Sequence, residues 1–334
     1  MKTYKYLSIL VLSTILVSCE TLFFEEEPKN NPEDLFENFW ETYNNCYAGF
    51  EARKVDWGEM YATYRPQVNA NTTDDELYTI LTKMLTPLND MHIKLTAPDR
   101  KVFTSNIYFN SKIDYDIFDI ELIKNEYLTK INLDYEGVVM GWNGNVGYVW
   151  FEYISDNMWH INDVLNYFEN ADGLIIDLRH NGGGAFTYSY TSMGRLTNEK
   201  RLTHRSKTKN GTGKNDFTEW YEWNISPEGD YYDKPLVLLT DRYTGSAAER
   251  TVMALKVLPN LIQIGDTTNG GHSTMIGREL ANGWSYTVCP QVIEWADGKC
   301  YEGIGMPPDI YIKNTMEEIN AGQDKTLELA IGQF

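Results

Sequence analysis

The chain contains only four cysteines among its 334 residues, and no two of them form a CxxC pair. Cys19 lies near the start of the chain, so three thiols remain in the rest: Cys46, Cys289 and Cys300. An odd number of thiols without paired spacing predicts neither a zinc site nor a clear disulfide framework. We therefore expect no metal in this protein.

Positive charge is also scarce. Lysine and arginine together number 29, against 48 aspartates and glutamates, which gives a formal net charge of −19. Proteins that bind nucleic acid neutralise phosphates with lysine and arginine, so this balance excludes nucleic acid as an expected partner. The excess of acidic residues is typical of a soluble, well-solvated surface.

The apolar run near the N-terminus is short. It covers residues 7–17, too few to cross a bilayer as a helix, and it follows two lysines. This layout is typical of a secretory signal peptide over residues 1–18. The run closes on "LVSC", which resembles a bacterial lipobox, so we expect cleavage before Cys19 and a lipid on its thiol. Residues 19–30 then form a tether, whose acidic residues resemble the surface-export signal of Bacteroidetes lipoproteins; an ordinary signal peptide with a chance cysteine is the alternative.

Three regions follow the tether. Residues 31–100 have helical periodicity and predict an N-terminal helical subdomain. Residues 101–145 are a small β-rich connecting region, too short for a further domain of ordinary size. From residue 146 to the end, apolar strands alternate with helices, which predicts an α/β core with parallel strand pairing. Within that core, residues 200–232 are polar and aromatic, and we expect a hairpin or flap there.

Ser246 stands where a buried strand, "KPLVLLT", leads through a short loop into a helix. Ligands of open α/β sheets gather beyond the carboxyl ends of strands, which is where this serine falls. The positive end of the helix dipole favours negative charge at such a position. Taken alone, however, a serine here is more often a helix N-cap than a nucleophile.

A second buried strand, "GLIIDL", ends in "RHNGGG". Three successive glycines leave backbone N–H groups uncovered, and such a turn can bind an oxyanion. Two strands of one sheet that end in Gly-Gly-Gly and Gly-Ser can bring donors beside a nucleophile. His180, in the same segment, is expected to point to solvent.

The segments "DLRHNGGG", "TDRYTGSAAE", "GDTTNGG" and "GIGMPPDI" occur in the order found in the S41 serine peptidases, and the resemblance covers roughly residues 75–315. It implies a crotonase/ClpP-like core of ββα units with Ser246 as nucleophile. It also implies oxyanion donors at the Ala247 N–H and in the glycine turn, at Gly183 or the neighbouring Gly182. The 101–145 region is too short for the complete PDZ domain that the family often carries.

The C-terminal processing branch of this family places a lysine base about 25 residues after the serine. Here that position is near Gly271, and no lysine occurs between Lys256 and Lys299. The tricorn-like branch uses histidine and glutamate instead, and its motifs resemble "LNDMHIKL" and "YEGIGMPPDI". The resemblance therefore implies His92 as the base and Glu302 as the acid that orients it.

Two features complicate this assignment. The tricorn pattern has a serine just before its histidine, and Met91 takes that position here. His272 adjoins the position of the missing lysine and is the alternative base.

The expected function is that of a serine endopeptidase that cleaves peptide bonds through an acyl-enzyme, without a cofactor, at the cell envelope. Its partners would be a peptide or protein substrate and, through the N-terminal lipid, a membrane. The alternative is a non-catalytic protein that binds peptides or hydrophobic ligands on the same fold. An esterase with the same triad is a third hypothesis.

Overall fold

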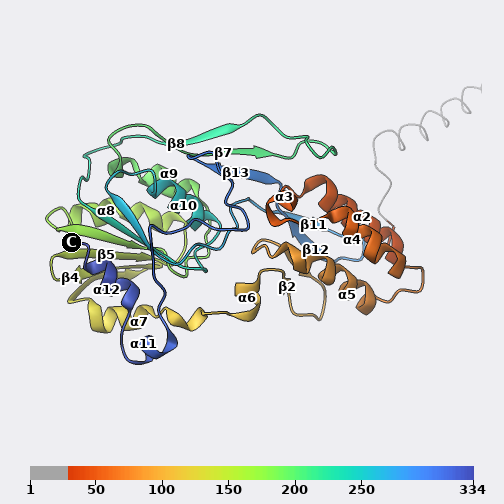
Figure 1. The fold of residues 1–334 in the computed structure, drawn as a ribbon, viewed down its shortest axis with the longest axis horizontal. Helices are drawn as coiled ribbons and strands as arrows, with labels where there is room; N and C mark the ends of the chain where they lie inside the picture. Colours follow the sequence, from red (N-terminus) through yellow and green to blue (C-terminus); the bar gives the residue numbers. More distant parts are fainter. Residues whose placement is uncertain (1–28) are drawn as a thin grey trace, which may run out of the picture.

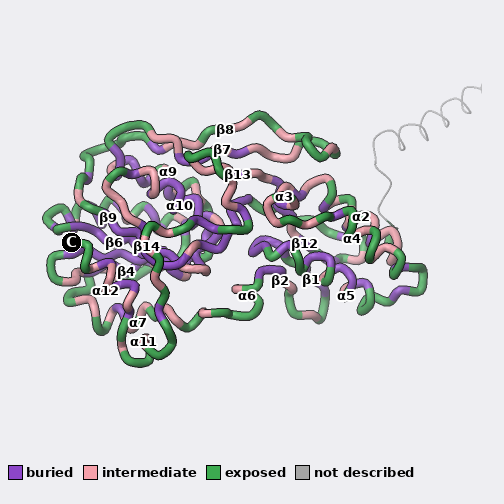
Figure 2. The backbone as a smooth tube through the Cα atoms, viewed as in Figure 1, coloured by how far each residue is buried: buried purple, intermediate pink, exposed green. Residues whose placement is uncertain are grey.

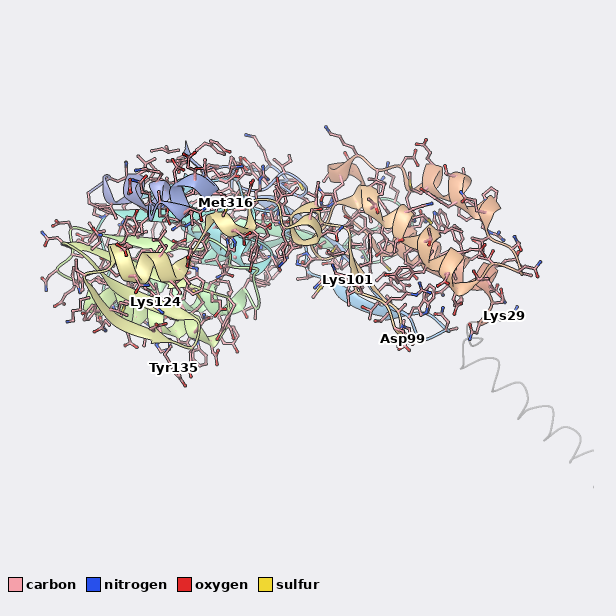
Figure 3. The ribbon with its side chains drawn as sticks, turned by 90° about the horizontal axis from the view of Figure 1, so that it is seen from below. Lys29, Asp99, Lys101, Lys124, Tyr135 and Met316 are labelled. Carbon is pink, nitrogen blue, oxygen red and sulfur yellow. The ribbon has the colours of Figure 1, made fainter. Side chains whose placement is uncertain are left out.

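The computed structural model describes residues 29–334, so the signal peptide and Cys19 lie outside the described residues. The described chain forms two lobes side by side (Figure 1). We call them the helical lobe, built from residues 32–104 and 276–289, and the α/β lobe, built from the remaining residues. Side chains fill both lobes, with Asp99 and Lys101 on the helical lobe and Lys124 and Tyr135 on the α/β lobe (Figure 3).

The helical lobe contains the predicted N-terminal helices: α2 (Pro32–Cys46), α3 (Phe50–Arg53), α4 (Trp57–Tyr64) and α5 (Asp74–Leu85). Helix α2 begins where the Asn31 side chain accepts the Asp34 N–H. Helix α5 begins at a capping box in which Thr73 and Glu76 bond each other's backbone N–H groups. The apolar stripes of both helices are buried in a common core with Tyr286 and Val288, from late in the chain.

A four-stranded antiparallel sheet completes this lobe in the order β11 (Ile276–Glu279), β12 (Ser285–Val288), β1 (Lys94–Thr96) and β2 (Phe103–Thr104). Leu95 pairs with Tyr286 in this sheet. The hairpin of β11 and β12, from the C-terminal third of the chain, therefore completes the helical lobe. Because the chain returns to this lobe, the two lobes are connected at more than one place in the sequence.

The α/β lobe is built on a seven-stranded sheet, in the order β14 (Ile310–Tyr311), β10 (Leu261–Gly265), β9 (Leu236–Thr240), β6 (Gly173–Asp177), β5 (Val146–Phe151), β4 (Val138–Asn143) and β3 (Lys130–Tyr135). The five strands from β14 to β5 are parallel, and β4 and β3 are antiparallel. The α/β fold class predicted from the alternation of strands and helices is confirmed.

Alternate residues of the central strands face two separate apolar layers. On one side, Leu174 and Ile176 of β6 share a core with α8 (Ile161–Tyr167) and α10 (Ala247–Leu255). On the other side, Ile175 lies in a core with α12 (Lys325–Ile331). The buried inner strands appear as continuous purple tube in Figure 2, which explains why their sequences read as unbroken apolar runs.

The 101–145 region differs from its predicted β-rich character in its first half. It contains α6 (Ile107–Ser111) and α7 (Ile120–Leu122) before β3 begins. Asn106 and Asp119 accept backbone N–H groups at the starts of these helices. These local caps favour helical turns in a stretch that lacks regular periodicity.

Residues 200–232 form the predicted hairpin, with β7 (Arg201–Thr208) paired to β8 (Tyr221–Ile225). Strand β13 (Gln291–Trp295) pairs with the other edge of β7. The hairpin extends from the α/β lobe toward the helical lobe along the top of Figure 1. Trp223 packs on His204 with rings 5.7 Å apart and on Phe186 of the lobe beneath at 4.9 Å, so this aromatic side chain contributes to packing.

The described fold also contains the short helices α9 (Thr187–Ser192) and α11 (Met316–Asn320). Cys46, Cys289 and Cys300 are free thiols. No helix within residues 29–334 combines the length and the hydrophobicity needed to cross a bilayer.

Candidate functional site

Ser246 lies in the loop between β9 and α10, directly before the first residue of the helix. Its backbone has φ 57° and ψ −122°, a conformation that residues with a side chain seldom adopt. The Gly245 N–H donates to the backbone oxygen of Asn181, which ties this loop to the glycine turn. A strained serine held by surrounding hydrogen bonds is typical of a functional position rather than of a simple helix cap.

His92 lies in the loop that leads into β1, and its imidazole reaches the serine from the helical lobe. Its Nε2 lies 2.8 Å from the Ser246 Oγ, across 154 positions of sequence. The histidine is buried and the serine is half-buried. The structure thus brings together the two residues that the sequence motifs single out, at the junction of the lobes.

The position expected for a lysine base lies beside the same imidazole. A Cβ atom added to Gly271 would lie 3.6 Å from His92 Cε1 and only 2.6 Å from Met91 Cγ. His92 and Met91 therefore occupy the space next to Gly271. His92 thus lies beside Ser246 in the region where the C-terminal processing branch would place its lysine.

Glu302 lies near this pair but differs from its expected contact. Its Oε1 accepts a hydrogen bond from Arg53 at 2.6 Å, and its Oε2 accepts the backbone N–H groups of His272 and Ser273 at 2.9 and 3.2 Å. Between residues 29 and 334, no group hydrogen-bonds the His92 Nδ1. The expected bond from His92 to Glu302 is absent, since neither Glu302 oxygen lies within 4.0 Å of a ring nitrogen of His92 and the carboxylate is instead held by Arg53 and two amides.

His272, the alternative base, is buried between two carboxylates. Its Nε2 lies 3.4 Å from Glu249 Oε1, and its Nδ1 lies 3.8 Å from Glu302 Oε2. Neither ring nitrogen has a hydrogen-bond partner among the described residues, and neither bonds Ser246. Of the two histidines considered as base, His92 alone makes the contact that proton transfer requires.

Glu249, in the first turn of α10, anchors the loops around the serine. Its oxygens accept the N–H groups of Gly270 and Gly271 at 2.6 and 2.8 Å, and that of Ser246 at 3.2 Å. The carboxylate is fully buried. It thereby holds the Gly270–Gly271 segment and the strained serine backbone in one arrangement.

The glycine turn packs against Ser246 as predicted, but its donors are arranged differently. The Gly183 N–H already donates to Asn181 Oδ1 at 3.0 Å. Over the described chain, no acceptor is recorded for the N–H groups of Gly182 and Ala247. These two donors, rather than that of Gly183, are available to an oxyanion.

Gly183 is instead required because the glycine turn and the serine loop approach each other closely at this residue. Its φ is +99°, and an added Cβ would lie 2.6 Å from the Ser246 Cβ and 2.8 Å from the Ala247 nitrogen. We expect Gly183→Ala to displace the serine loop and to lower the rate of hydrolysis at least about 100-fold, since small misplacements of catalytic groups have effects of this size. Gly182→Ala is the matched control for space, because a Cβ there meets nothing within 4 Å. Equal rates for Gly183→Ala and the wild-type protein would contradict this account of the turn.

The model of peptidase family S41 matches residues 145–312, half of the chain, and that of the tricorn protease C1 domain matches residues 28–86. The chain belongs to peptidase family S41. It is 28% identical over 198 residues to the tricorn protease of Thermoplasma volcanium, covering 57% of this chain and 17% of that protein. It is 30% identical over 144 residues to the carboxy-terminal processing protease CtpA of Bacillus subtilis, covering 42% of this chain and 29% of that protein.

A solved structure extends this likeness along most of the S41 chain. A protein from Parabacteroides merdae ATCC 43184, assigned as a peptidase, superimposes with a TM-score of 0.82 and 29% identity. That match covers 91% of this chain and 97% of the other. The chain spans less than a third of the length of the two curated relatives. The comparisons therefore show the family and the fold of this chain, and the activities of those relatives are not assigned to it.

Sequence reasoning missed three residues of this S41 site: Asp90, Arg53 and Tyr47. Asp90 is fully buried and accepts hydrogen bonds from the Tyr47 hydroxyl and the His92 backbone N–H, both at 2.9 Å. Arg53 Nε lies 3.5 Å from the same carboxylate. The Asp-x-His spacing in "NDMHIKL" was a signal for the aspartate, because an Asp side chain readily bonds the N–H two residues later. No local pattern pointed to Arg53 or Tyr47.

The buried charges set the protonation states of the site. Burial lowers the pKa of His92 below its ordinary value, although the negative charges of Asp90, Glu302 and Glu249 oppose this. Burial alone would raise the pKa of Asp90, but Arg53 and His92 outweigh it and leave that pKa below its usual range. At neutral pH the histidine is therefore neutral and the aspartate ionised, as a base and its partner must be.

Asp90, His92 and Cys289 place possible metal-ligand atoms within 4.8 Å of one another. The surroundings do not suit a cation. Burial raises the pKa of the Cys289 thiol well above its usual range, so it stays protonated, and the Arg53 guanidinium lies beside the aspartate. A metal ligand must be deprotonated and free of a competing cation, so this group fits a hydrogen-bonded cluster better than a metal site.

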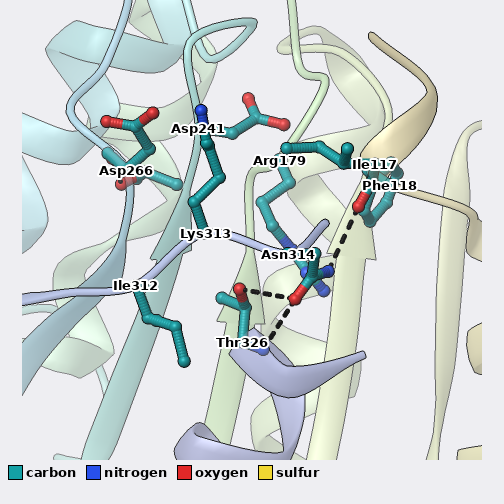
Figure 4. A pocket seen from close by; sticks show the side chains of 10 residues that line it. Ile117, Phe118, Arg179, Asp241, Asp266, Ile312, Lys313, Asn314 and Thr326 are labelled. Carbon is teal, nitrogen blue, oxygen red and sulfur yellow. Dashed lines mark hydrogen bonds between the residues drawn. The ribbon is translucent and has the colours of Figure 1, made fainter. Parts of the chain in front are cut away.

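His180 does not point to solvent as expected. Its side chain is 11% exposed, with Nδ1 at 2.5 Å from Asp241 Oδ2 and Nε2 at 2.7 Å from the Tyr115 carbonyl oxygen. Asp241 also lines a small cavity of about 20 Å³ (Figure 4). There Asn314 bonds both Thr326 and the Ile117 carbonyl, so the polar groups of this cavity largely satisfy one another.

Proposed function

We propose that this protein is a serine peptidase in which Ser246 is the nucleophile and His92 the general base. The 2.8 Å contact between Ser246 Oγ and His92 Nε2 is the observation that carries this proposal. Membership of peptidase family S41 and the neutral state of the imidazole support it.

The reaction is an acyl transfer. His92 Nε2 accepts the hydroxyl proton as Ser246 Oγ attacks the peptide carbonyl, and it then returns that proton to the leaving amine. The oxyanion accepts hydrogen bonds from the Ala247 and Gly182 N–H groups, aided by the positive end of α10. A water molecule, activated in turn by His92, hydrolyses the acyl-enzyme.

Glu302 takes part at a distance. Its negative charge favours the imidazolium that forms at His92, and its hydrogen bonds fix Arg53 and the start of the 272–273 segment. We assign it an electrostatic and structural role near the serine and the histidine.

We also propose that the protein works at the cell envelope, held to a membrane by a lipid on Cys19, and that its substrates are peptides or proteins. The lipobox-like "LVSC" and the short apolar run before it support this location. The relatives' own descriptions as proteases support the substrate class.

The test is hydrolysis of a mixed peptide library, with products identified by mass spectrometry. We expect the wild-type protein to generate new peptide termini without added metal or cofactor, and Ser246→Ala to generate none. Folded wild-type protein that binds peptides but cleaves none would favour the non-catalytic alternative. Cleavage of p-nitrophenyl esters without cleavage of any peptide would favour the esterase.

A further inference from the structure

We propose that Asp90, rather than Glu302, is the positioning residue whose carboxylate receives the Nδ1–H of His92 during the reaction. The inference deepens the proposed function and rests on it, since it concerns the partner of the proposed base. It concerns a carboxylate that lies two residues before the histidine in the same loop.

The tautomer of His92 creates the need for such a partner. To accept the serine proton, Nε2 must be unprotonated, so the single ring proton of the neutral imidazole resides on Nδ1. That nitrogen is buried and has no hydrogen-bond partner in the described part of the chain. When Nε2 gains a proton, the Nδ1–H becomes part of a cation and requires an acceptor in an enclosed site.

Distance selects Asp90 as the acceptor. Its Oδ1 lies 3.8 Å from His92 Nδ1, and over residues 29–334 no other carboxylate oxygen lies within 4.0 Å of this imidazole. Catalytic hydrogen bonds are often long before substrate binds and shorten as charge develops. A movement of about 1 Å by the ring or the carboxylate would complete this bond.

The groups around Asp90 keep its carboxylate ionised and hold it close to His92. Oδ1 already accepts the His92 backbone N–H at 2.9 Å, so the same loop carries the carboxylate and the imidazole side by side. Oδ2 accepts the Tyr47 hydroxyl at 2.9 Å and faces Arg53 Nε at 3.5 Å. The Ser105 hydroxyl donates to the Asp90 backbone oxygen at 3.0 Å and accepts its N–H at 2.9 Å.

Glu302 lies farther from the imidazole. Within residues 29–334 neither of its oxygens lies within 4.0 Å of a ring nitrogen of His92, and hydrogen bonds from Arg53 and from two backbone amides hold the carboxylate in that place. Arg53 contacts both carboxylates. Three other charged or titratable groups face the histidine from neighbouring elements: Glu249, Arg250 and Cys289. None of them lies within ion-pair distance of Nδ1.

The experiment compares Asp90→Asn with Glu302→Gln in the full chain, using the rate of labelling by a fluorophosphonate and histidine-selective NMR. We expect Asp90→Asn to lower the labelling rate at least 100-fold and to move the His92 titration to lower pH, because a neighbouring negative charge is lost. Glu302→Gln should lower the rate less than 10-fold. The opposite order of the two variants would overturn the inference.

A structural readout guards against a variant that fails to fold. In phosphonylated wild-type protein, the His92 Nδ1–H should give a strongly downfield proton signal, and Glu302→Gln should retain it. Loss of that signal in folded Glu302→Gln would overturn the inference even if Asp90→Asn cannot be purified. Wild-type protein that is never labelled would instead refute the proposed peptidase, while the shift of the His92 titration in Asp90→Asn would still test the pairing.

Discussion

Replacement of His92 by alanine is expected to lower the rate of fluorophosphonate labelling and of peptide hydrolysis by about 10⁴-fold, the upper range for loss of a general base. The reason is that Ser246 then has no acceptor for its proton, since the ring of His272 does not reach it. The second-order rate constant for labelling is the measurement that checks this. His160→Ala is the matched control, because His160 is a surface residue with only long contacts to acidic side chains.

The pH dependence of the wild-type rate has a defined sign. The base must be neutral, and the pKa of His92 lies below its ordinary value because of burial. The rate should therefore rise with pH through a midpoint below about 6.5 and reach a plateau before neutrality. If His272→Ala abolished labelling through this pH range and His92→Ala did not, the assignment of the base would be wrong.

The second large effect is on stability. We expect Arg53→Met to lower the free energy of unfolding by about 3–5 kcal/mol at neutral pH, because two buried carboxylates lose their shared cation. Asp90 and Glu302 both contact this guanidinium, which also donates to the carbonyl oxygens of Asn89 and Gly270. Urea unfolding followed by tryptophan fluorescence measures the change.

Arg65→Met serves as the control, since Arg65 pairs with Glu37 in the same lobe but is 28% exposed. Its loss should cost less than about 1 kcal/mol, as for other surface ion pairs. If both arginine variants unfolded at the same urea concentration, the contacts of Arg53 with Asp90 and Glu302 would not stabilise the fold as proposed.

Much of the fold could be predicted because its patterns are local. The stripe along α5 and the continuous apolar strands β6 and β9 follow directly from residue periodicity. The hairpin of β11 and β12 could not be placed, because nothing near residue 276 shows that its partner is Leu95, far back in the chain. Its location in the helical lobe depends on long-range packing alone.

The candidate site shows the same division. Ser246, His92 and the glycine turn occur in recognisable segments, and the structure brings them within contact distance. The contact of Glu302 with Arg53 could not be deduced from the segment "YEGIGMPPDI", because Arg53 lies on a separate helix far back in the chain. Likewise, the Asn181 side chain accepts the Gly183 N–H, a hydrogen bond that the spacing of residues in the sequence does not reveal.

The most direct measurement for the central claim is to treat the purified protein with a fluorophosphonate and to locate the modified residue by peptide mapping. The account predicts one phosphonyl group, carried by Ser246, in wild-type protein and none in folded Ser246→Ala. Modification of another residue, or none in folded wild-type protein, would contradict it.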